Sequence, residues 1–263
     1  MLSALVTGAS RGVGKGVATA LHAAGYRVFA PGRTIETADL ASRIVRIPCN
    51  HTDDEQTAAA VARIARDTPS LDLVVNNSWG GYERMMEDGR FTWGLPFWQQ
   101  PAHRWSSMMD AGVRAAWAVS SRAVPLMLSE EPLPQKRGLI VNISVWAAQK
   151  FIGNTINGVS KAATDKLTAD MAHELRPHGI SVISLYPGLV RTEAVLEAAK
   201  FGVFTLDNSE SPEFIGRVIA RLAHDPRLAD RSGTVVVAAQ AAAELGVTDV
   251  DGKQPAPLTL QTA

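Results

Sequence analysis

Short aliphatic segments alternate with helix-type segments along almost the whole chain. Seven segments are short, apolar and mostly unbroken by polar residues: 2–7, 27–30, 44–48, 73–76, 139–143, 182–185 and 234–237. Such runs are typical of strands that are buried on both faces of a sheet. The helix-type segments between them include residues 14–24, 53–66, 105–128, 159–176 and 212–223. This alternation predicts an α/β fold of the Rossmann type: a doubly wound parallel sheet of about seven strands, with helices on both faces.

The length and composition favour one soluble α/β domain. A chain of 263 residues suits a single domain of this class, and no repeat or low-complexity linker divides it, so we expect one domain over residues 1–263. The net charge is zero, without a basic block, so nothing electrostatic favours nucleic acid or a membrane as partner. The apolar run 2–6 is too short to span a bilayer and lacks the features of a signal peptide, so we expect a cytoplasmic protein.

The cysteine content argues against a metal site. Cys49 is the only cysteine, which excludes an internal disulfide bond and a thiolate cluster. Cys49 and His51 alone supply too few ligands to hold a metal ion. We therefore expect no metal.

A glycine-rich turn follows the first predicted strand. It reads Thr7-Gly8-Ala9-Ser10-Arg11-Gly12-Val13-Gly14 and opens a predicted helix. Glycines let the backbone approach a pyrophosphate, and the helix N-terminus offers N–H donors and a positive dipole end. The position after a strand, inside a βαβ unit, favours a dinucleotide site over a merely tight turn. The predicted cofactor residues of this turn are Gly8, Ser10, Arg11, Gly12, Val13 and Gly14.

The end of the second predicted strand indicates which dinucleotide binds. NAD sites place an acidic residue there for the ribose 2′-hydroxyl, whereas NADP sites place an arginine near the 2′-phosphate. This strand ends Phe29-Ala30-Pro31-Gly32-Arg33, without an acid. Arg33 and Arg11 can pair with a phosphate together, so we expect NADP(H) as the cofactor. The alternative is that both arginines are solvated surface residues.

Further segments resemble the short-chain dehydrogenase/reductase family. Asn76-Asn77-Ser78-Trp79-Gly80 follows the fourth predicted strand, and Val141-Asn142-Ile143-Ser144 ends the fifth. Asn157-Gly158-Val159-Ser160-Lys161 has the spacing of the family's Tyr-x-x-x-Lys motif, and Tyr186-Pro187-Gly188 follows the sixth strand. Residues 162–167, 172–175 and 249–252 resemble the branch called dehydrogenase/reductase member one. The resemblance covers essentially the whole chain.

The resemblance implies both an activity and an assembly. It implies NADPH-dependent reduction of a small carbonyl compound. It also implies a homodimer or homotetramer, formed through the helices around Asp110 and residues 159–176.

The resemblance also implies further cofactor contacts. Asn50 stands where the family usually has an aspartate near the adenine, and its amide oxygen can accept a hydrogen bond from the adenine amino group. Asn76 is expected to brace the sheet, and the residues after it, including Ser78, to border the cofactor. Lys161 is expected to hold the nicotinamide ribose. Pro187 and Gly188 complete the predicted cofactor site.

Two of the four residues that carry the family's chemistry are replaced here. Ser144 and Lys161 keep their places. The tyrosine that gives or takes the proton is Asn157, whose amide has no titrating proton. The asparagine of the central helix is Asp110, a carboxylate expected close to Lys161, and such a pair can shift both pKa values.

The missing tyrosine leaves several interpretations open. In the first, another acid replaces the tyrosine, from among Tyr82, His103, Tyr186, Asp110 and Lys161. In the second, the substrate needs no proton, as with an iminium ion. In the others, the chain binds NADP(H) as a sensor or scaffold without turnover, or it is a non-redox cyclase or lyase on the same fold.

Aromatic residues favour an apolar substrate pocket. Residues 80–101 and 189–211 are predicted to be long irregular loops, which in compact domains are usually functional. Trp79, Trp98, Trp146 and Tyr186 are predicted to line a pocket for a bulky substrate. The alternative is that several of them belong to the core.

Overall fold

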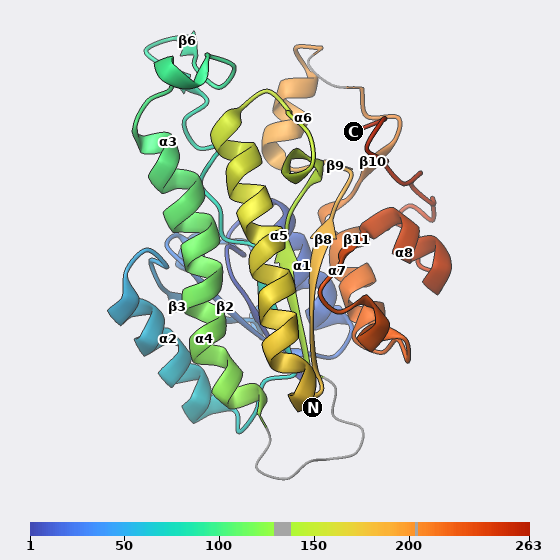
Figure 1. Ribbon diagram of the computed structural model, residues 1–263. Coiled ribbons are helices and arrows are strands. Elements are labelled where there is room, and N and C mark those ends of the chain that lie inside the picture. Colours follow the sequence, from blue (N-terminus) through green and yellow to red (C-terminus); the bar gives the residue numbers. More distant parts are fainter. Residues whose placement is uncertain (129–137, 203–204) are drawn as a thin grey trace.

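A parallel sheet of seven strands runs through the molecule (Figure 1). The computed structural model describes residues 1–128, 138–202 and 205–263. The strand order is β11-β8-β7-β4-β1-β2-β3. The strands are β1 (Ser3–Val6), β2 (Arg27–Gly32), β3 (Val45–Pro48), β4 (Leu73–Asn76), β7 (Gly138–Ile143), β8 (Ile180–Tyr186) and β11 (Val235–Val237). The predicted doubly wound α/β fold is therefore confirmed.

Helices cover both faces of this sheet because its strands are apolar on both faces. In β1, Ala4 and Val6 pack into one core cluster, whereas Leu5 packs into the other, since alternate residues of a strand point to opposite faces. The first face carries α1 (Gly12–Ala23), α7 (Pro212–Leu222) and α8 (Ala238–Leu245). The second face carries α2 (Asp54–Asp67), α4 (Ala115–Met127) and α5 (Thr155–Leu175), which lie in front in Figure 1.

The strand order reverses at β1, which lies between β2 and β4. In sheets of this kind a crevice for ligands opens at the carboxyl ends of the strands beside the reversal. The glycine-rich turn follows β1, and residues 77–79 follow β4. Ser144 follows β7, and Pro187 follows β8. The fold thus brings the predicted site segments to one edge of the sheet.

The segment 80–101, predicted to be an irregular loop, contains a short hairpin. It contains β5 (Met86–Glu87), antiparallel to β6 (Arg90–Phe91), and the short 3-10 helix η2 (Phe97–Gln99). The turn residues Asp88 and Gly89 have φ angles of 49° and 74°. Two positive φ angles suit a tight hairpin turn, and the Asp-Gly dipeptide favours it. This dipeptide is the sequence signal that the prediction of a loop missed.

The other predicted loop and the central helix are also more structured than expected. The described part of residues 189–211 contains β9 (Leu189–Val190), α6 (Glu193–Ala199) and β10 (Ser209–Glu210). The helix predicted at 105–128 divides into α3 (His103–Trp105), a π-helical stretch η3 (Ser106–Arg114) and α4. Within the described residues no helix is both long and apolar enough to cross a membrane.

Candidate active site

The glycine-rich turn is tied to the turn that follows β4. Thr7 Oγ1 accepts hydrogen bonds from the backbone N–H groups of Asn77 and Ser78 at 2.9 and 3.0 Å. The Asn77 side chain donates to the carbonyl oxygens of Thr7 and Gly8 at 3.3 and 3.2 Å. A Cβ atom on Gly14 would lie 2.3 Å from the Gly8 carbonyl oxygen, so this approach requires glycine. Asn77 was not among the predicted site residues, yet it fixes the shape of the turn.

Two carboxylates bind the donors that the sequence assigns to cofactor phosphates. Arg11 Nη2 and Arg33 Nη2 both lie 2.7 Å from Glu83 Oε1. The Gly12 N–H, at the start of α1, donates to Glu193 Oε2 at 3.0 Å. The site therefore has two anion-binding points, one beside the end of β2 and one at a helix N-terminus. Two such points fit the phosphate groups of a dinucleotide.

The other residues predicted at the cofactor end have varied partners. Ser10 Oγ lies 3.2 Å from the place of a Cβ atom on Gly32, at the end of β2. Asn50 Oδ1 accepts hydrogen bonds from the N–H and hydroxyl of Thr52. Val13 packs against the core on the α1 face.

Asn76 braces the sheet, as expected. Its Nδ2 donates to Ser120 Oγ of α4 at 2.9 Å and to Asn142 Oδ1 of β7 at 2.8 Å. These bonds link β4 to the neighbouring strand and to the helix above it. The contact of Asn76 with the cofactor stays a prediction.

The turn after β8 is held by a buried glutamate. The Gly188 N–H donates to Glu210 Oε2 at 2.8 Å, and the preceding Pro187 is buried. Burial raises the pKa of Glu210 to about 7. This carboxyl, which sequence reasoning missed, fixes the path of the chain directly after Tyr186.

Ser144 and Lys161 lie next to each other at the end of β7. Ser144 Oγ donates to the Lys161 carbonyl oxygen at 3.4 Å. Lys161 Nζ donates to the carbonyl oxygen of Ile143 at 3.2 Å and lies 4.8 Å from the centroid of the Trp79 ring. The lysine is only 8% exposed. Burial lowers the pKa of Lys161 to about 8, although the charge of Asp165 acts in the opposite direction.

Asn157 lies one helical turn before Lys161. Helix α5 begins at Thr155 rather than at residue 159, and the Asn154 side chain caps it by accepting a hydrogen bond from the Asn157 N–H at 3.0 Å. Residues four apart on a helix share a face, so Asn157 and Lys161 are neighbours. Asn157 is 3% exposed, and its Oδ1 has no hydrogen-bond partner. Buried acceptors are rarely left unpaired, so this oxygen marks a point where a bound molecule can donate.

The carboxylate that acts on Lys161 is Asp165 rather than Asp110. Asp110 lies half-buried in η3, and no ion pair joins it to Lys161 in the part of the chain that the structure describes. Asp165 follows Lys161 by one turn of α5, and its negative charge favours the charged form of the lysine. The prediction that Asp110 is the carboxylate that acts on Lys161 is therefore wrong. The spacing of four residues between Lys161 and Asp165 was the available signal.

Tyr186 belongs to the same buried network. Its hydroxyl donates to Asp165 Oδ2 and accepts from Gln149 Nε2 at 3.5 Å. Burial, together with the hydrogen bond to Asp165, raises the pKa of Tyr186 well above its usual value. The phenol therefore keeps its proton, which points at a carboxylate.

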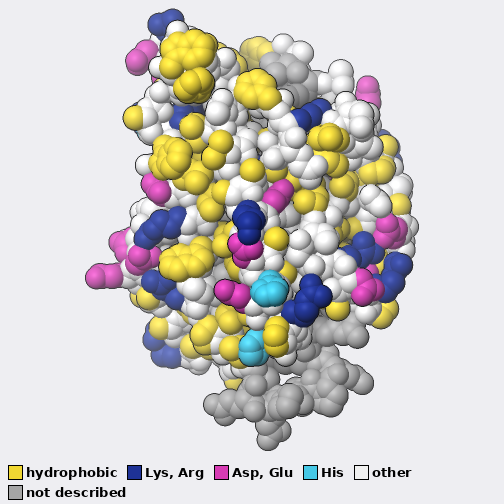
Figure 2. Space-filling model, viewed as in Figure 1, with side chains coloured by type: hydrophobic (Ala, Val, Ile, Leu, Met, Phe, Trp, Pro, Cys, Tyr) yellow, Lys and Arg dark blue, Asp and Glu magenta, His cyan; other side chains and the backbone are white. Residues whose placement is uncertain are grey.

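The four predicted pocket residues are only partly brought together. The rings of Trp146 and Tyr186 meet edge to face, with centroids 5.2 Å apart. Trp79 covers the Lys161 ammonium and packs against Gly112 of η3. Trp98 is 71% exposed and packs on Phe97. Figure 2 shows hydrophobic side chains gathered at the end of the molecule where β6 lies.

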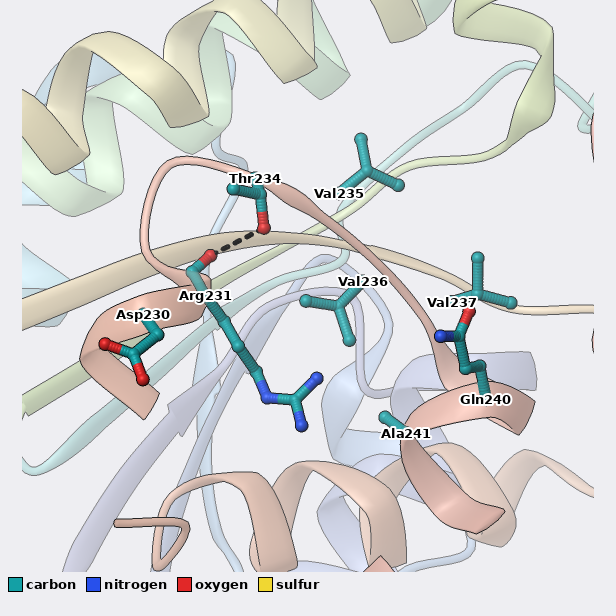
Figure 3. A pocket seen from close by; sticks show the side chains of 8 residues that line it. All are labelled: Asp230, Arg231, Thr234, Val235, Val236, Val237, Gln240 and Ala241. Atoms are coloured by element: carbon teal, nitrogen blue, oxygen red, sulfur yellow. Dashed lines mark hydrogen bonds between the residues drawn. The ribbon is translucent and has the colours of Figure 1, made fainter. Parts of the chain in front are cut away.

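A separate hollow of about 160 Å³ lies at the outer edge of β11 (Figure 3). Its lining residues are Asp230, Arg231, Thr234, Val235, Val236, Val237, Gln240 and Ala241. Arg231 is paired with Asp225 at 3.1 Å and with Glu244 at 2.7 Å. The hollow contains none of the predicted site residues. No group of three or more metal-ligating side chains occurs in the described residues.

Comparisons with known proteins point to one family. The family model of short chain dehydrogenases matches residues 3–201. Two mammalian proteins named dehydrogenase/reductase SDR family member 1 are similar over 95% of this chain and 83% of their own length, at 35% identity for Mus musculus and 34% for Homo sapiens. Serine 3-dehydrogenase from Rhizobium radiobacter is 26% identical over 73% of each chain.

Solved structures share the fold. A short-chain type dehydrogenase/reductase from Mycobacterium marinum has a TM-score of 0.74 at 23% identity, covering 90% of this chain and 93% of that one. The 3-ketoacyl-(acyl-carrier-protein) reductase from Brucella melitensis, complexed with NADH, has a TM-score of 0.71 at 19% identity, covering 90% and 96%.

Proposed function

The chain belongs to the short-chain dehydrogenase/reductase family of oxidoreductases, and we propose that it is an NADP(H)-dependent reductase of a small carbonyl compound in which Lys161 supplies the proton. The family assignment confirms the resemblance drawn from the sequence, including the branch. The observation that carries the proposal is the buried ammonium of Lys161. Its Nζ donates to the carbonyl oxygen of Ile143, the residue before Ser144, and burial lowers its pKa to about 8. Asn157, one helical turn away, stands at the position of the family's proton donor.

The charged side chains at the cofactor end support NADP(H). Arg11 and Arg33 converge on a single carboxylate oxygen, so together they can bind one anionic group. The end of β2 offers Gly32 and Arg33 but no acid for a ribose 2′-hydroxyl. In the proposed complex the two arginines hold the 2′-phosphate and the Gly12 N–H faces the pyrophosphate.

The reaction needs a hydride and a proton. A bound NADPH would supply the hydride for the carbonyl carbon. Ser144 can turn its hydroxyl from the Lys161 carbonyl oxygen to the substrate oxygen and orient it. The Lys161 ammonium then gives a proton to the same oxygen and is protonated again from water.

Lys161 suits the role of acid better than the other candidates do. A general acid is most effective when its pKa is close to the working pH, and about 8 meets this condition. The proton of Tyr186 is bound by Asp165, and the pKa of this phenol is raised. Tyr82 packs on Trp79, and His103 lies 3.5 Å from Glu87. Neither of these bonds to Ser144 or Lys161.

Two other functions compete with this proposal. An iminium substrate would need no proton, but a buried ammonium disfavours a second cation beside it. A binding protein without turnover, serving as a sensor or scaffold, is favoured by Asn157 alone. The retained Ser144 and Lys161 argue against it.

Rapid-mixing measurements of NADPH oxidation against ketones, quinones and cyclic imines test the proposal. We expect oxidation with a carbonyl compound, and we expect Lys161→Met to slow it by about 10²- to 10⁴-fold while calorimetry still detects NADPH binding. Binding of NADPH without reduction of any compound would favour the sensor or the non-redox enzyme. Failure to bind NADPH would overturn the cofactor assignment.

We also propose a homodimer or homotetramer that pairs through α4 and α5. Trp117 of α4 and Val159 of α5 expose large apolar side chains on this surface, which is the face seen in Figure 2. Burial of such side chains favours association. Light scattering at micromolar concentration is expected to give a dimeric or tetrameric mass, and a monomeric mass would exclude this assembly.

A further inference from the structure

Two glutamates occupy the anion-binding points of the site. We propose that Glu83 and Glu193 are internal competitors of the cofactor, which its phosphates must displace before they bind. The inference rests on the proposed binding of NADP(H). It adds that the affinity and the selectivity for the cofactor are set partly by two acidic residues that lie far from the glycine-rich turn in the sequence.

Glu83 mimics a phosphate between two arginines. It lies in the hairpin segment (residues 80–101), and one of its carboxylate oxygens is 2.7 Å from both Arg11 Nη2 and Arg33 Nη2. All three side chains are accessible, with exposed fractions of 67% for Arg11, 58% for Arg33 and 35% for Glu83. A phosphate carries more charge and more acceptor oxygens than a carboxylate. The 2′-phosphate can therefore replace Glu83 on the same two donors.

Glu193 takes the place of a second anion at the start of α1. The N-cap residue of this helix, Arg11, provides no side-chain cap, and its first turn has no acidic residue. Glu193, the first residue of α6, accepts the hydrogen bond of the Gly12 N–H instead. A Cβ atom on Gly12 would lie 3.4 Å from Thr192 Cγ2, so the start of α6 lies directly against the glycine-rich turn. A pyrophosphate bound at this helix end must move Glu193 aside.

Displacement of Glu83 also affects the surroundings of Lys161. Tyr82, its neighbour in the chain, packs edge to face on Trp79 with ring centroids 4.6 Å apart. Trp79 in turn covers the Lys161 ammonium. When the 2′-phosphate releases Glu83, the hairpin segment can move and take this aromatic pair with it. Binding at the adenosine end is thereby coupled to access at Lys161.

The size of the competition follows from the exposure of the groups. Exposed ion pairs are individually weak, so removing the charge of one competitor is expected to tighten the matching ligand by about three- to tenfold. The two glutamates must differ in which ligands they oppose. Glu83 opposes only ligands that carry a 2′-phosphate, whereas Glu193 opposes only ligands that carry a pyrophosphate.

Calorimetry with three ligands separates these effects. The ligands are NADPH, which has both groups, adenosine 2′-monophosphate, which has only the first, and NADH, which has only the second. Glu83→Gln is expected to tighten NADPH and adenosine 2′-monophosphate and to leave NADH within about twofold. Glu193→Gln is expected to tighten NADPH and NADH and to leave adenosine 2′-monophosphate within about twofold.

Matched variants control for a general loss of negative charge. Glu87→Gln lies in the same hairpin segment, but Glu87 pairs with Arg84 and His103 and accepts a hydrogen bond from the Thr92 hydroxyl. Glu197→Gln lies on α6 and pairs with Lys200. Both are expected to bind all three ligands as the unmutated protein does. Equal tightening by the control variants would attribute the effect to net charge and overturn the inference.

Hydrogen exchange of the unmutated protein gives an independent measurement. Addition of NADPH is expected to speed exchange in residues 80–91 and in α6, because both lose their anchors. Slower exchange in both segments, or Glu83→Gln with unchanged or weaker affinity for NADPH, would overturn the inference while leaving the proposed function intact. Absence of NADPH binding in every variant would instead refute the proposed function, and the inference with it.

Discussion

Arg11, Arg33 and Glu83 meet at the surface, whereas Ser144, Lys161 and Tyr186 meet in the interior. In the first region the charges come from three separate segments, and each remains open to water. In the second region these three side chains are buried and hydrogen-bonded within the fold, and burial shifts the pKa values of Lys161 and Tyr186. An exposed ion pair is readily exchanged for a ligand, while a buried network keeps its protonation states when a ligand arrives. We infer that the arginines at the cofactor end can exchange Glu83 for a ligand, whereas the residues at the catalytic end keep their protons in fixed positions.

The largest expected effect is the loss of kcat when the buried ammonium of Lys161 is removed. Lys161→Met is expected to lower kcat for carbonyl reduction by about 10²- to 10⁴-fold, because general acid catalysis contributes this much. Single-turnover rates at saturating NADPH measure it. Lys166→Met is the matched control on the same helix, because this lysine is exposed and pairs only with Asp170 among the described residues. A Lys161→Met enzyme with nearly normal kcat would show that the proton comes from elsewhere.

Restoring the family's tyrosine tests the same region in the opposite direction. Asn157→Tyr is expected to raise kcat for simple ketones by about 10²-fold, with less change in KM, because the proton is needed in the transition state. The larger ring enters a buried position, so the free energy of unfolding is expected to fall by about 1–3 kcal/mol. Asn157→Phe adds the same bulk without a hydroxyl and is expected to give no increase. Equal rates for the two variants would rule out the hydroxyl as the cause.

The cofactor end is expected to respond in affinity rather than in rate. Arg33→Ala removes one of two donors and should weaken NADPH by about tenfold, with NADH unchanged, because charged hydrogen bonds contribute this order of energy. Titration calorimetry with both dinucleotides measures the difference. Arg66→Ala, an exposed position on α2, is the control. Equal affinity of the unmutated protein for NADPH and NADH would remove the assignment of the two arginines.

The smallest effect is expected from the carboxylate beside Lys161. The negative charge of Asp165 raises the pKa of this lysine, so Asp165→Asn should lower it further. The alkaline limb of the kcat profile should then move to lower pH, by roughly one pH unit or less. Asp170→Asn, exposed on the same helix, should leave the limb in place. A shift to higher pH would mean that another group controls the rate.

The same contrast explains what the sequence predicts and what it misses. Seven aliphatic runs predict the sheet because strands buried on both faces have few polar residues. The glycine-rich turn follows from a local motif, whereas the partners of Asn76 lie 44 and 66 residues away and do not. Two further local patterns were available in the sequence. The Asp88-Gly89 dipeptide indicates the hairpin turn, and the spacing of four residues between Lys161 and Asp165 indicates that the two side chains are neighbours on a helix.

Contacts between distant segments are a different matter. Glu83 lies 72 residues from Arg11 in the chain, and Glu193 lies 181 residues from Gly12. No local pattern of hydrophobic or turn residues encodes such contacts, because they depend on how loops fold over the sheet edge. The pKa of Lys161 likewise depends on burial, which needs the packed structure.

The pH dependence of kcat tests most directly whether Lys161 supplies the proton. Single-turnover reduction of a ketone, at saturating NADPH and substrate, can be followed from about pH 6 to about pH 10. An ammonium donates only while it is protonated, so the rate should stay level below the pKa of Lys161, about 8, and fall by about tenfold per pH unit above it. A rate that stays level to pH 10, or that rises through pH 8, would contradict the account.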